Sequence, residues 1–167
     1  LDEMEAITSA SLNFVRESNV NETNKEVDIN ALLASICDDL HDAGLQVEYQ
    51  NSERLIYSCR TKALKRALTN LISNGAIYGQ QARVEIKIKH QNLQIIITDK
   101  GAGIPEEMHE RIFEPFVRSE DSRNRETGGT GLGMSIARTI ILHHGGDIKL
   151  LNQANGFTVL VTLPRVV

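Results

Sequence analysis

The stretch Asp99–Gly133 reads DKGAGIPEEMHERIFEPFVRSEDSRNRETGGTGLG and carries a glycine cluster at each end. The first cluster, DKGAGIP (99–105), follows an apolar run, and the second, GGTGLGMSIA (128–137), leads into a helical pattern. Between them lies a polar run, SEDSRNRET (119–127), which cannot bury itself. Glycine is used where the backbone needs a positive φ or where a ligand must come close. The stretch therefore predicts a mobile lid hinged over an anionic ligand, which we interpret as a nucleotide.

The size and composition are those of an ordinary folded domain. The chain has 167 residues, of which 41% are hydrophobic and 24% charged, and its net charge is −4. This length suffices for one domain with a real core and a small appendage. The negative charge argues against nucleic-acid binding, which normally needs a basic face, and no apolar run reaches membrane-spanning length. Cys37 and Cys59 lack metal-ligand spacing, so we expect buried thiols in a reducing compartment.

The first 25 residues predict a helix followed by a linker. Residues 1–16 place one apolar stripe on a helix, formed by Leu1, Met4, Ile7, Leu12 and Val15. A stripe on one short helix must pack against something, so we interpret the segment as the end of a bundle helix. A helix folded onto its own domain is the alternative. Residues 17–25, ESNVNETNK, are polar and predict the linker. Because the chain starts at Leu1 rather than Met, we expect a fragment or a processed form.

The rest of the chain alternates between short strands and helices. Predicted strands cover residues 26–29, 45–50, 54–59, 82–90, 93–99, 147–152 and 157–164, and predicted helices cover 30–44, 61–79 and 131–144. The expected caps are Asn30 and Thr61 at helix starts and Gly44, Gly79 and Gly145-Gly146 at helix ends, with a hairpin turn at Gln91-Asn92. This order predicts an α+β fold, a two-layer α/β sandwich with the helices on one face of a mixed, largely antiparallel sheet.

Polar side chains recur every four residues along the predicted helix 61–79. They are Arg66, Asn70, Asn74 and Tyr78, which share one stripe. Asparagine disfavours helix interiors because its side chain competes for backbone hydrogen bonds, so two of them one turn apart call for a reason. Taken alone, the stripe is better explained as an exposed polar face. Asp99, however, ends a predicted central strand at the first glycine cluster, and such strand ends are typical places for ligand recognition.

Two common phosphate-binding signatures are missing from the sequence. No G-x-x-x-x-G-K-[ST] run occurs. A dinucleotide fingerprint needs G-x-G-x-x-G directly between a strand and a helix, whereas GAG (101–103) leads into Ile104-Pro105 and GTGLG (129–133) follows a polar run. What remains is a helix with a glycine-rich N-terminus, which offers free N–H donors and the positive end of its dipole to phosphate.

Four segments together resemble the ATP-binding catalytic domain of sensor histidine kinases, a branch of the GHKL superfamily of gyrase-type, Hsp-type chaperone and mismatch-repair ATPases. NLISN (70–74) is similar to the N box, DKGAGIP to the first glycine box, FEPF (113–116) to the F box, and GGTGLGMSIA to the second glycine box. The resemblance implies the Bergerat (GHKL-type) sandwich. It also divides the chain into the end of the second dimerisation, or histidine-phosphotransfer, helix (1–16), a linker (17–25) and a catalytic domain (26–167).

The resemblance implies a role for each candidate site residue. Asn74 would be a Mg²⁺ ligand, Asn70 would contact the phosphates or a metal-bound water, and Asp99 would accept the exocyclic amine of adenine. The other implied nucleotide-binding residues are Tyr78, Gly101, Gly103, Ile104, Arg118, Gly129, Thr130, Gly131, Leu132 and Gly133. Arg123 or Arg125 could replace Arg118 at the γ-phosphate. Phe113 and Phe116 would anchor the base of the lid, and plain core packing fits them equally well.

Asn70 also bears on the reaction. ATP-hydrolysing members of the superfamily have a glutamate general base four residues before the metal asparagine, whereas Asn70 is an amide that cannot take a proton at neutral pH. The chain would therefore transfer the γ-phosphoryl group of ATP to a histidine and leave ADP, mainly by positioning and charge stabilisation. We interpret His109-Glu110 as a surface pair and His144 as a structural helix-stop residue. The acceptor histidine is thus expected on a dimerisation domain upstream.

Two other functions compete with the kinase interpretation. One is a GHKL-type ATPase or serine-directed kinase, and the other is a degenerate nucleotide-binding module. Ile77, where many members have a basic residue, and Gly75, in place of the usual alanine, motivate the second. For the kinase, we expect a homodimeric parent protein that acts indirectly on a response regulator and binds no nucleic acid. This domain would be cytoplasmic and could be monomeric as a fragment, and an inner-membrane anchor on the parent stays open.

Overall fold

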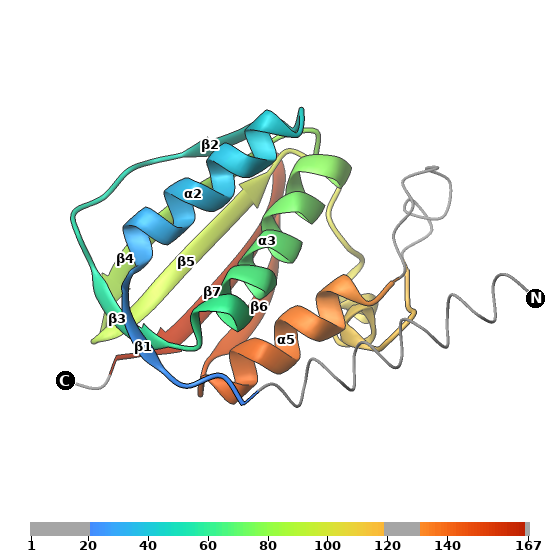
Figure 1. Cartoon of the computed structure of the whole chain (residues 1–167). Helices are drawn as coiled ribbons and strands as arrows, with labels where there is room; N and C mark the ends of the chain where they lie inside the picture. The colour runs from blue at the N-terminus through green and yellow to red at the C-terminus, as the bar shows by residue number, and fades with distance from the viewer. Residues whose placement is uncertain (1–20, 119–130, 166–167) are drawn as a thin grey trace, which may run out of the picture.

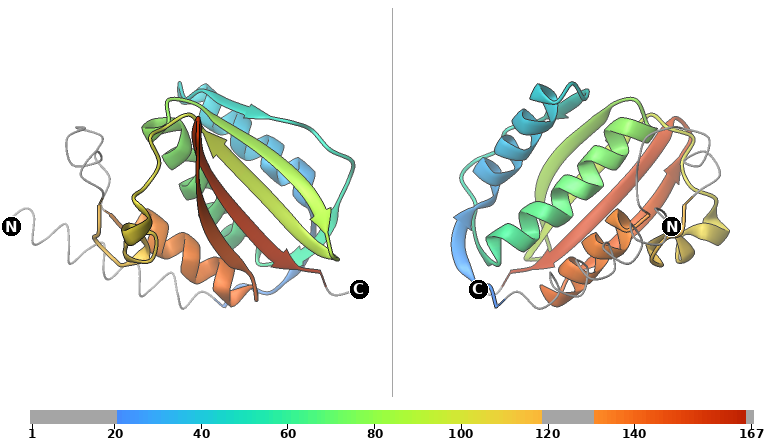
Figure 2. Two further views of the ribbon diagram at one scale, coloured as in Figure 1. Left: turned by 180° about the vertical axis from the view of Figure 1, so that it is seen from behind. Right: turned by 45° about the vertical axis from the view of Figure 1, so that its right-hand side comes forward.

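Three helices cover one face of a five-stranded sheet, as the computed structural model shows for residues 21–118 and 131–165 (Figure 1). The strands are β1 (Lys25–Asp28), β2 (Val47–Tyr49), β3 (Ile56–Cys59), β4 (Ala82–Lys89), β5 (Asn92–Asp99), β6 (Asp147–Gln153) and β7 (Gly156–Pro164). The helices are α2 (Ile29–Asp42), α3 (Thr61–Tyr78) and α5 (Gly133–His143), with short 3₁₀ turns η1 (Glu106–Met108) and η2 (Arg111–Phe113). Seen from behind, the other face of the sheet carries none of the helices of the described residues (Figure 2).

The main sheet has the strand order β2-β4-β5-β7-β6. β2 pairs with β4 in parallel, and the other three pairs are antiparallel. β1 and β3 form a separate two-stranded antiparallel sheet. The predicted α+β sandwich with a mixed, largely antiparallel sheet is therefore confirmed, with the correction that two of the predicted strands leave the main sheet.

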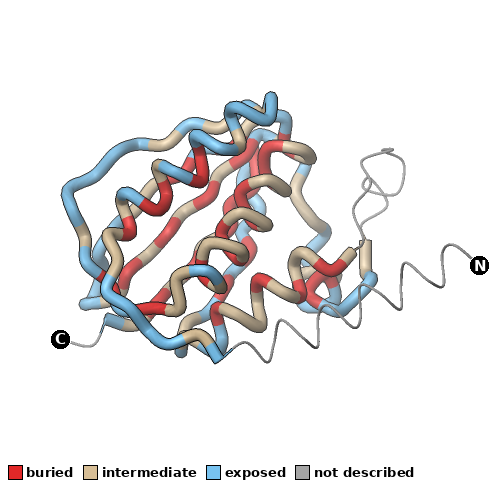
Figure 3. The backbone as a smooth tube through the Cα atoms, viewed as in Figure 1, coloured by how far each residue is buried: buried red, intermediate tan, exposed pale blue. Residues whose placement is uncertain are grey.

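Strand alternation explains why the helices lie on one face only. In β5, Leu93, Ile95 and Ile97 are almost completely buried, while the residues between them are half-buried. Because successive side chains of a strand point to opposite faces, this alternation gives the sheet one dry face, and the buried stripes of α2 and α3 pack onto it (Figure 3). Both cysteines lie in this core as free thiols, as predicted, and burial raises the pKa of Cys37 to about 11.

The helix caps differ from the predicted ones. α2 starts at Ile29, and its N-cap is Asp28, whose Oδ1 accepts the N–H of Asn30, so Asn30 is not the cap. α3 starts at Thr61 itself, and its N-cap residue is Arg60, which makes no side-chain cap bond. The side-chain oxygen of an N-cap residue usually accepts the N–H two or three residues later in the chain. At α2 the Asp28 carboxylate accepts the N–H of Asn30 in this way.

Both glycine stops of the outer helices are confirmed by their backbones. Gly44 (φ 92°) follows α2, and Gly145 (φ 74°) follows α5. Glycine adopts this left-handed conformation without steric cost. α5 itself begins at Gly133, two residues later than predicted.

The β4–β5 hairpin turns one residue earlier than predicted. Lys89 pairs with Asn92, so the turn residues are His90 (φ 50°) and Gln91 (φ 64°). Positive φ at both central residues defines the turn type whose twist matches that of the strands. Neither residue is a glycine, which is why composition did not locate the turn.

The start of α3 is capped by residues from distant parts of the chain. The Glu22 carboxylate accepts the N–H groups of Lys62 (2.7 Å) and Ala63 (3.1 Å), and His144 Nε2 accepts the N–H of Arg60 (3.2 Å). These groups are among the first N–H groups of a helix, which have no partner within it. Part of the predicted linker is therefore attached to the domain, and His144 has the predicted structural role.

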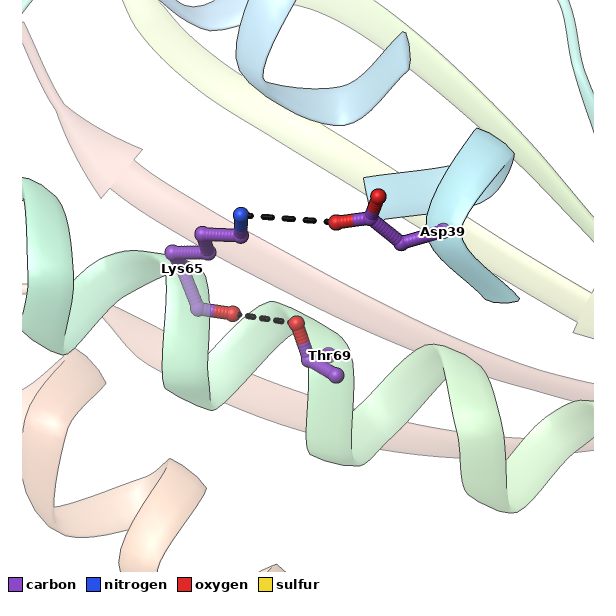
Figure 4. Close-up of polar contacts among 3 residues, drawn as sticks. All are labelled: Asp39, Lys65 and Thr69. Carbon is purple, nitrogen blue, oxygen red and sulfur yellow. Dashed lines mark hydrogen bonds and ion pairs between the residues drawn. The ribbon is translucent and has the colours of Figure 1, made fainter. Parts of the chain in front are cut away.

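An ion pair links α3 to α2, and a side-chain hydrogen bond lies next to it within α3. Lys65 Nζ lies 3.5 Å from Asp39 Oδ2 across the two helices, and Thr69 Oγ1 donates to the Lys65 carbonyl at 2.7 Å (Figure 4). Both charged side chains are largely exposed, so the ion pair adds little stability. The predicted helix 1–16 and the predicted lid 119–127 lie outside the described residues.

Candidate nucleotide-binding site

Asn70, in the polar stripe of α3, contacts the beginning of α5. Arg66, Asn70, Asn74 and Tyr78 are all half-buried. Asn70 Nδ2 donates to the Gly133 carbonyl at 3.3 Å, and an added Cβ on Gly133 would lie 3.8 Å from Asn70 Cγ. Two predicted site segments, 63 residues apart in sequence, therefore meet here. The stripe is not simply an exposed polar face.

Asp99 is a buried carboxyl group at the end of β5. It is 8% exposed, and its Oδ1 accepts the N–H of Gly101 at 2.7 Å. Burial raises the pKa of Asp99, and the hydrogen bond from Gly101 acts in the opposite direction. A second oxygen, Oδ2, faces Gly75 of α3. Such an acceptor at the rim of a sheet can receive an N–H donor from a ligand.

Close approach of the backbone around Asp99 depends on glycine. A Cβ on Gly79, at the end of α3, would collide with Asp99 Cβ and Cγ, and one on Gly101 would lie 2.9 Å from Oδ1. A Cβ on Gly75 would instead meet Ala82, Ile97 and Asp99 Oδ2 at 3.4–3.6 Å, which is ordinary contact. Glycine is therefore required at position 79 by the close contact with Asp99 as well as by the end of the helix, whereas Gly75 tolerates a methyl group.

The first glycine cluster forms an irregular loop over the end of the sheet. Gly103 has φ 81°, and Ile104 is half-buried. The Asn152 side chain of β6 bonds to both main-chain groups of Ile104. Of the two predicted glycines, Gly101 contacts Asp99 and Gly103 lies against Asn152.

The second glycine cluster is described only from Gly131 onward. Phe116 N–H donates to the Gly131 carbonyl at 2.9 Å, which closes the chain across the intervening segment. Leu132 is buried and Gly133 opens α5, so the helix begins at the glycine-rich sequence as predicted. Arg118 is half-buried. The predicted residues Gly129, Thr130, Arg123 and Arg125 fall outside the part of the chain that the structure describes.

The two phenylalanines of the F box behave differently. Phe113 is buried, and the guanidinium of Arg138 lies over its ring at 4.8 Å. Phe116 is 42% exposed and has a positive φ of 67°, which is unusual for a bulky residue. Core packing thus fits Phe113 and not Phe116. Because the predicted lid lies outside the described residues, its anchoring by either ring stays a prediction. A Cβ on Gly131 would meet the Phe116 backbone at 2.9 Å, so this turn leaves no room for another residue there.

His109 and Glu110 do not form a surface pair. His109 is half-buried, its Nε2 lies 2.8 Å from the Ile104 carbonyl, and its ring packs edge-on against Phe157. Glu110 is exposed and pairs with Arg138 at 3.1 Å. His109 therefore supports the first glycine loop.

Sequence patterns missed three residues that organise the candidate site, which are Asn152, His109 and, as a close-approach position, Gly79, and they also missed Glu22, which caps α3. Glu22 lies in a polar run without periodicity, and its partners Lys62 and Ala63 follow 40 and 41 residues later. Asn152 is an ordinary polar residue near the end of a predicted strand, so its type and position gave no signal. Only Gly79 gave a signal, as a glycine at the end of a predicted helix, and helix termination was a sufficient explanation for it.

The chain belongs to the family of histidine kinase-, DNA gyrase B- and HSP90-like ATPases, whose model matches residues 59–167. Within this family it is an ATP-binding domain of the sensor histidine kinase type, as two curated relatives indicate. Sensor histidine kinase GtrS of Pseudomonas aeruginosa is 34% identical over 168 residues, covering 99% of this chain and 34% of that protein. Sensor-like histidine kinase SenX3 of Mycolicibacterium smegmatis is 37% identical over 106 residues, covering 61% of this chain and 28% of that protein. The chain thus spans about a third of their length or less.

Solved structures share the fold. The nucleotide-free catalytic domain of histidine kinase ThkA superposes with a TM-score of 0.71 at 26% identity, covering 84% of this chain and 95% of that one. The mycobacterial sensor histidine kinase MprB gives a TM-score of 0.74 at 24% identity, covering 84% of this chain and 97% of that one.

The helices described within residues 21–118 and 131–165 are all too short or too polar to cross a membrane.

Proposed function

We propose that this chain transfers the γ-phosphoryl group of ATP to a histidine on a dimerisation domain upstream in the parent protein. The observation that carries the proposal is the meeting of three predicted motifs on α3. Asn70, in the middle of α3, contacts the start of α5 through Gly133. Asp99 lies against Gly101 and against Gly79, which ends α3. A nucleotide between these points would place its base at Asp99 and its phosphates at the N-terminus of α5.

Each end of this site suits one part of ATP. Asp99 Oδ1 is occupied by the Gly101 N–H, and Oδ2 would accept the exocyclic amine of adenine. Guanine presents a carbonyl at that position, which a carboxylate repels. At the other end, Gly131 and Gly133 put main-chain N–H groups and the positive end of the α5 dipole within reach of phosphate. Tyr78, Ile104 and Arg118 would complete the lining.

Asn74 would hold Mg²⁺ with its amide oxygen. The fit rests on the chemistry of the donor, because an amide oxygen is a hard oxygen ligand of the kind that Mg²⁺ prefers. Mg²⁺ commonly takes few protein ligands and the remainder from water and substrate phosphates, so a single half-buried amide oxygen beside a phosphate site suits it. When bound, the ion would neutralise phosphate charge.

Asn70 favours a kinase over a hydrolase. An amide cannot remove a proton from water at neutral pH, and the Asn70 amide nitrogen is already bonded to Gly133. In the proposed transfer, the bond from the γ-phosphorus to the bridging oxygen breaks and a phosphorus–nitrogen bond to imidazole forms. ADP leaves, and the imidazole proton is released.

The rest of the proposal concerns the parent protein. It would be a homodimer, joined through the dimerisation helices, and its phosphohistidine would supply a response regulator. The catalytic domain would work in the cytoplasm.

Calorimetric titration of ATP, with and without Mg²⁺, tests the site. We expect Mg²⁺-dependent binding that Asn74→Ala abolishes while the melting temperature without ligand stays nearly unchanged. Asp99→Asn should reduce the preference for ATP over GTP. A large loss of stability in Asn74→Ala would make Asn74 structural, and an unchanged preference in Asp99→Asn would refute its role.

Phosphotransfer to an added dimerisation domain distinguishes the remaining alternatives. Transfer of radiolabel from ATP to histidine supports the kinase. Nucleotide binding without transfer favours a degenerate module, and hydrolysis without any histidine partner favours an ATPase. No binding at millimolar ATP would refute the nucleotide site itself.

A further inference from the structure

The first glycine loop is held by a side chain that no motif includes. Asn152, on β6, accepts the N–H of Ile104 at its Oδ1 (3.2 Å) and donates from its Nδ2 to the Ile104 carbonyl (2.7 Å). One amide therefore satisfies both main-chain groups of one residue. This is the pairing that a neighbouring strand would provide, and it fixes an irregular loop as a strand would.

His109 completes the same contact. Its Nε2 lies 2.8 Å from the Ile104 carbonyl, and because a carbonyl only accepts, this nitrogen carries the proton. The Ile104 oxygen thus receives two hydrogen bonds, one for each lone pair. Asn152 Nδ2 and His109 Nε2 are 3.4 Å apart, since both donors converge on this oxygen. The edge-on packing of the His109 ring against Phe157, at 6.4 Å between centroids, holds the imidazole in place.

Gly103 owes its position in the loop partly to Asn152. It has φ 81°, and a Cβ added there would collide with Asn152 Oδ1 and lie 3.3 Å from Phe157 Cδ2. A side chain at residue 103 would therefore push the loop away from β6 and break the two bonds to Ile104. The glycine and the asparagine form one unit.

We propose that Asn152 is a positioning residue for the adenine base. This role rests on the proposed function, because the loop from Gly101 to Ile104 lies beside Asp99, the proposed base acceptor. With Ile104 fixed on one side and Gly101 bonded to Asp99 on the other, the loop is ordered before the nucleotide arrives. Ordering a loop only on binding reduces affinity. Asn152 acts on the base end of the site, not on the phosphates or the metal.

Titration of ADP and GDP at one fixed, saturating Mg²⁺ concentration tests this role, because the two nucleotides carry the same phosphates and differ only in the base. We expect Asn152→Ala to raise the Kd for ADP roughly five- to tenfold, which is the effect of losing one to two hydrogen bonds. The same variant should show a smaller preference for ADP over GDP. Gln153→Ala, a neighbouring exposed position on the same strand, is the matched control and should leave both values unchanged. Asn152→Asp, which retains the acceptor for the Ile104 N–H but loses the donor to its carbonyl, should also weaken binding.

Amide hydrogen exchange gives a second readout in the unliganded chain. The Ile104 amide should exchange faster in Asn152→Ala than in Gln153→Ala, with equal melting temperatures. An unchanged ADP/GDP preference in Asn152→Ala would overturn the inference, even if both affinities fell, because a merely structural loss weakens both nucleotides equally. Wild-type chain that binds no ADP would refute the proposed function itself, and with it this role.

Discussion

Two glycines near the end of α3, Gly75 within the helix and Gly79 directly after it, should respond to alanine in opposite ways. Gly75 and Gly79 lie one turn apart, and both face Asp99. A Cβ on Gly75 would have its nearest neighbours at 3.4–3.6 Å, in ordinary contact, whereas a Cβ on Gly79 would overlap Asp99 Cβ and Cγ and lie 2.5 Å from Oδ1. Gly79 has φ −98°, so alanine meets no backbone strain there and the collision alone decides the outcome.

The magnitudes follow from these contacts. Alanine is favoured over glycine inside a helix by about 1 kcal/mol, and at Gly75 nothing offsets that gain. For a chain of this size, 1 kcal/mol corresponds to about 2–4 °C in melting temperature, so Gly75→Ala should melt about 2–4 °C higher. Forcing an extra methyl group into packed surroundings costs about 1–3 kcal/mol, so Gly79→Ala should melt lower. It must also move the carboxylate of Asp99, and the Kd for ATP should rise at least about tenfold.

Thermal unfolding and ATP titration of the two variants check both halves of the prediction. Gly75→Ala should keep the wild-type Kd, which would also show that this glycine is no sign of a degenerate site. Two results would refute the reasoning. One is a destabilised Gly75→Ala variant, and the other is a Gly79→Ala variant that binds ATP as the wild type does.

Two further predictions concern the start of α3. Glu22→Ala removes the acceptor of the Lys62 and Ala63 N–H groups, and should lower the unfolding free energy by about 0.5–2 kcal/mol, the usual cost of losing an N-terminal cap. Glu26→Ala, at an exposed acidic residue, is the control. Equal urea midpoints for the two variants would contradict the cap. His144 donates from Nδ1 to the Ile140 carbonyl (2.7 Å) and accepts at Nε2, and burial lowers its pKa, so the folded chain resists protonation. As the pH falls below about 6.5, the ordinary histidine pKa, the unfolded state takes up this proton first and stability declines. Urea unfolding at pH 7.5 and 5.5 measures this effect, and the unfolding free energy of His144→Gln should fall less between the two pH values than that of the wild type. An identical fall in both proteins would refute the prediction.

The layers of the fold could be predicted from the sequence alone, and so could the segments that form the candidate site. The alternation in β5 and the helical stripe of α3 are local patterns with periods of two and about 3.6 residues, so burial of one face follows directly from them. The site segments were recognisable for a similar reason. Asn70, Asn74 and Asp99 are chemically distinctive residues at a helix face and a strand end, and glycine clusters mark close approach wherever they occur.

The side chains that hold α3 and the loops of the candidate site in place could not be predicted in this way. Asn152 bonds to Ile104 across 48 residues, and Glu22 caps α3 across 40. A polar side chain at a strand end or in a linker can serve many partners, and nothing in its neighbours along the chain selects one. The partner is set by strand order and register, which are properties of the whole sheet. For the same reason, Gly79 could be predicted as the end of a helix, while its contact with Asp99 emerged only when α3 and β5 were packed together.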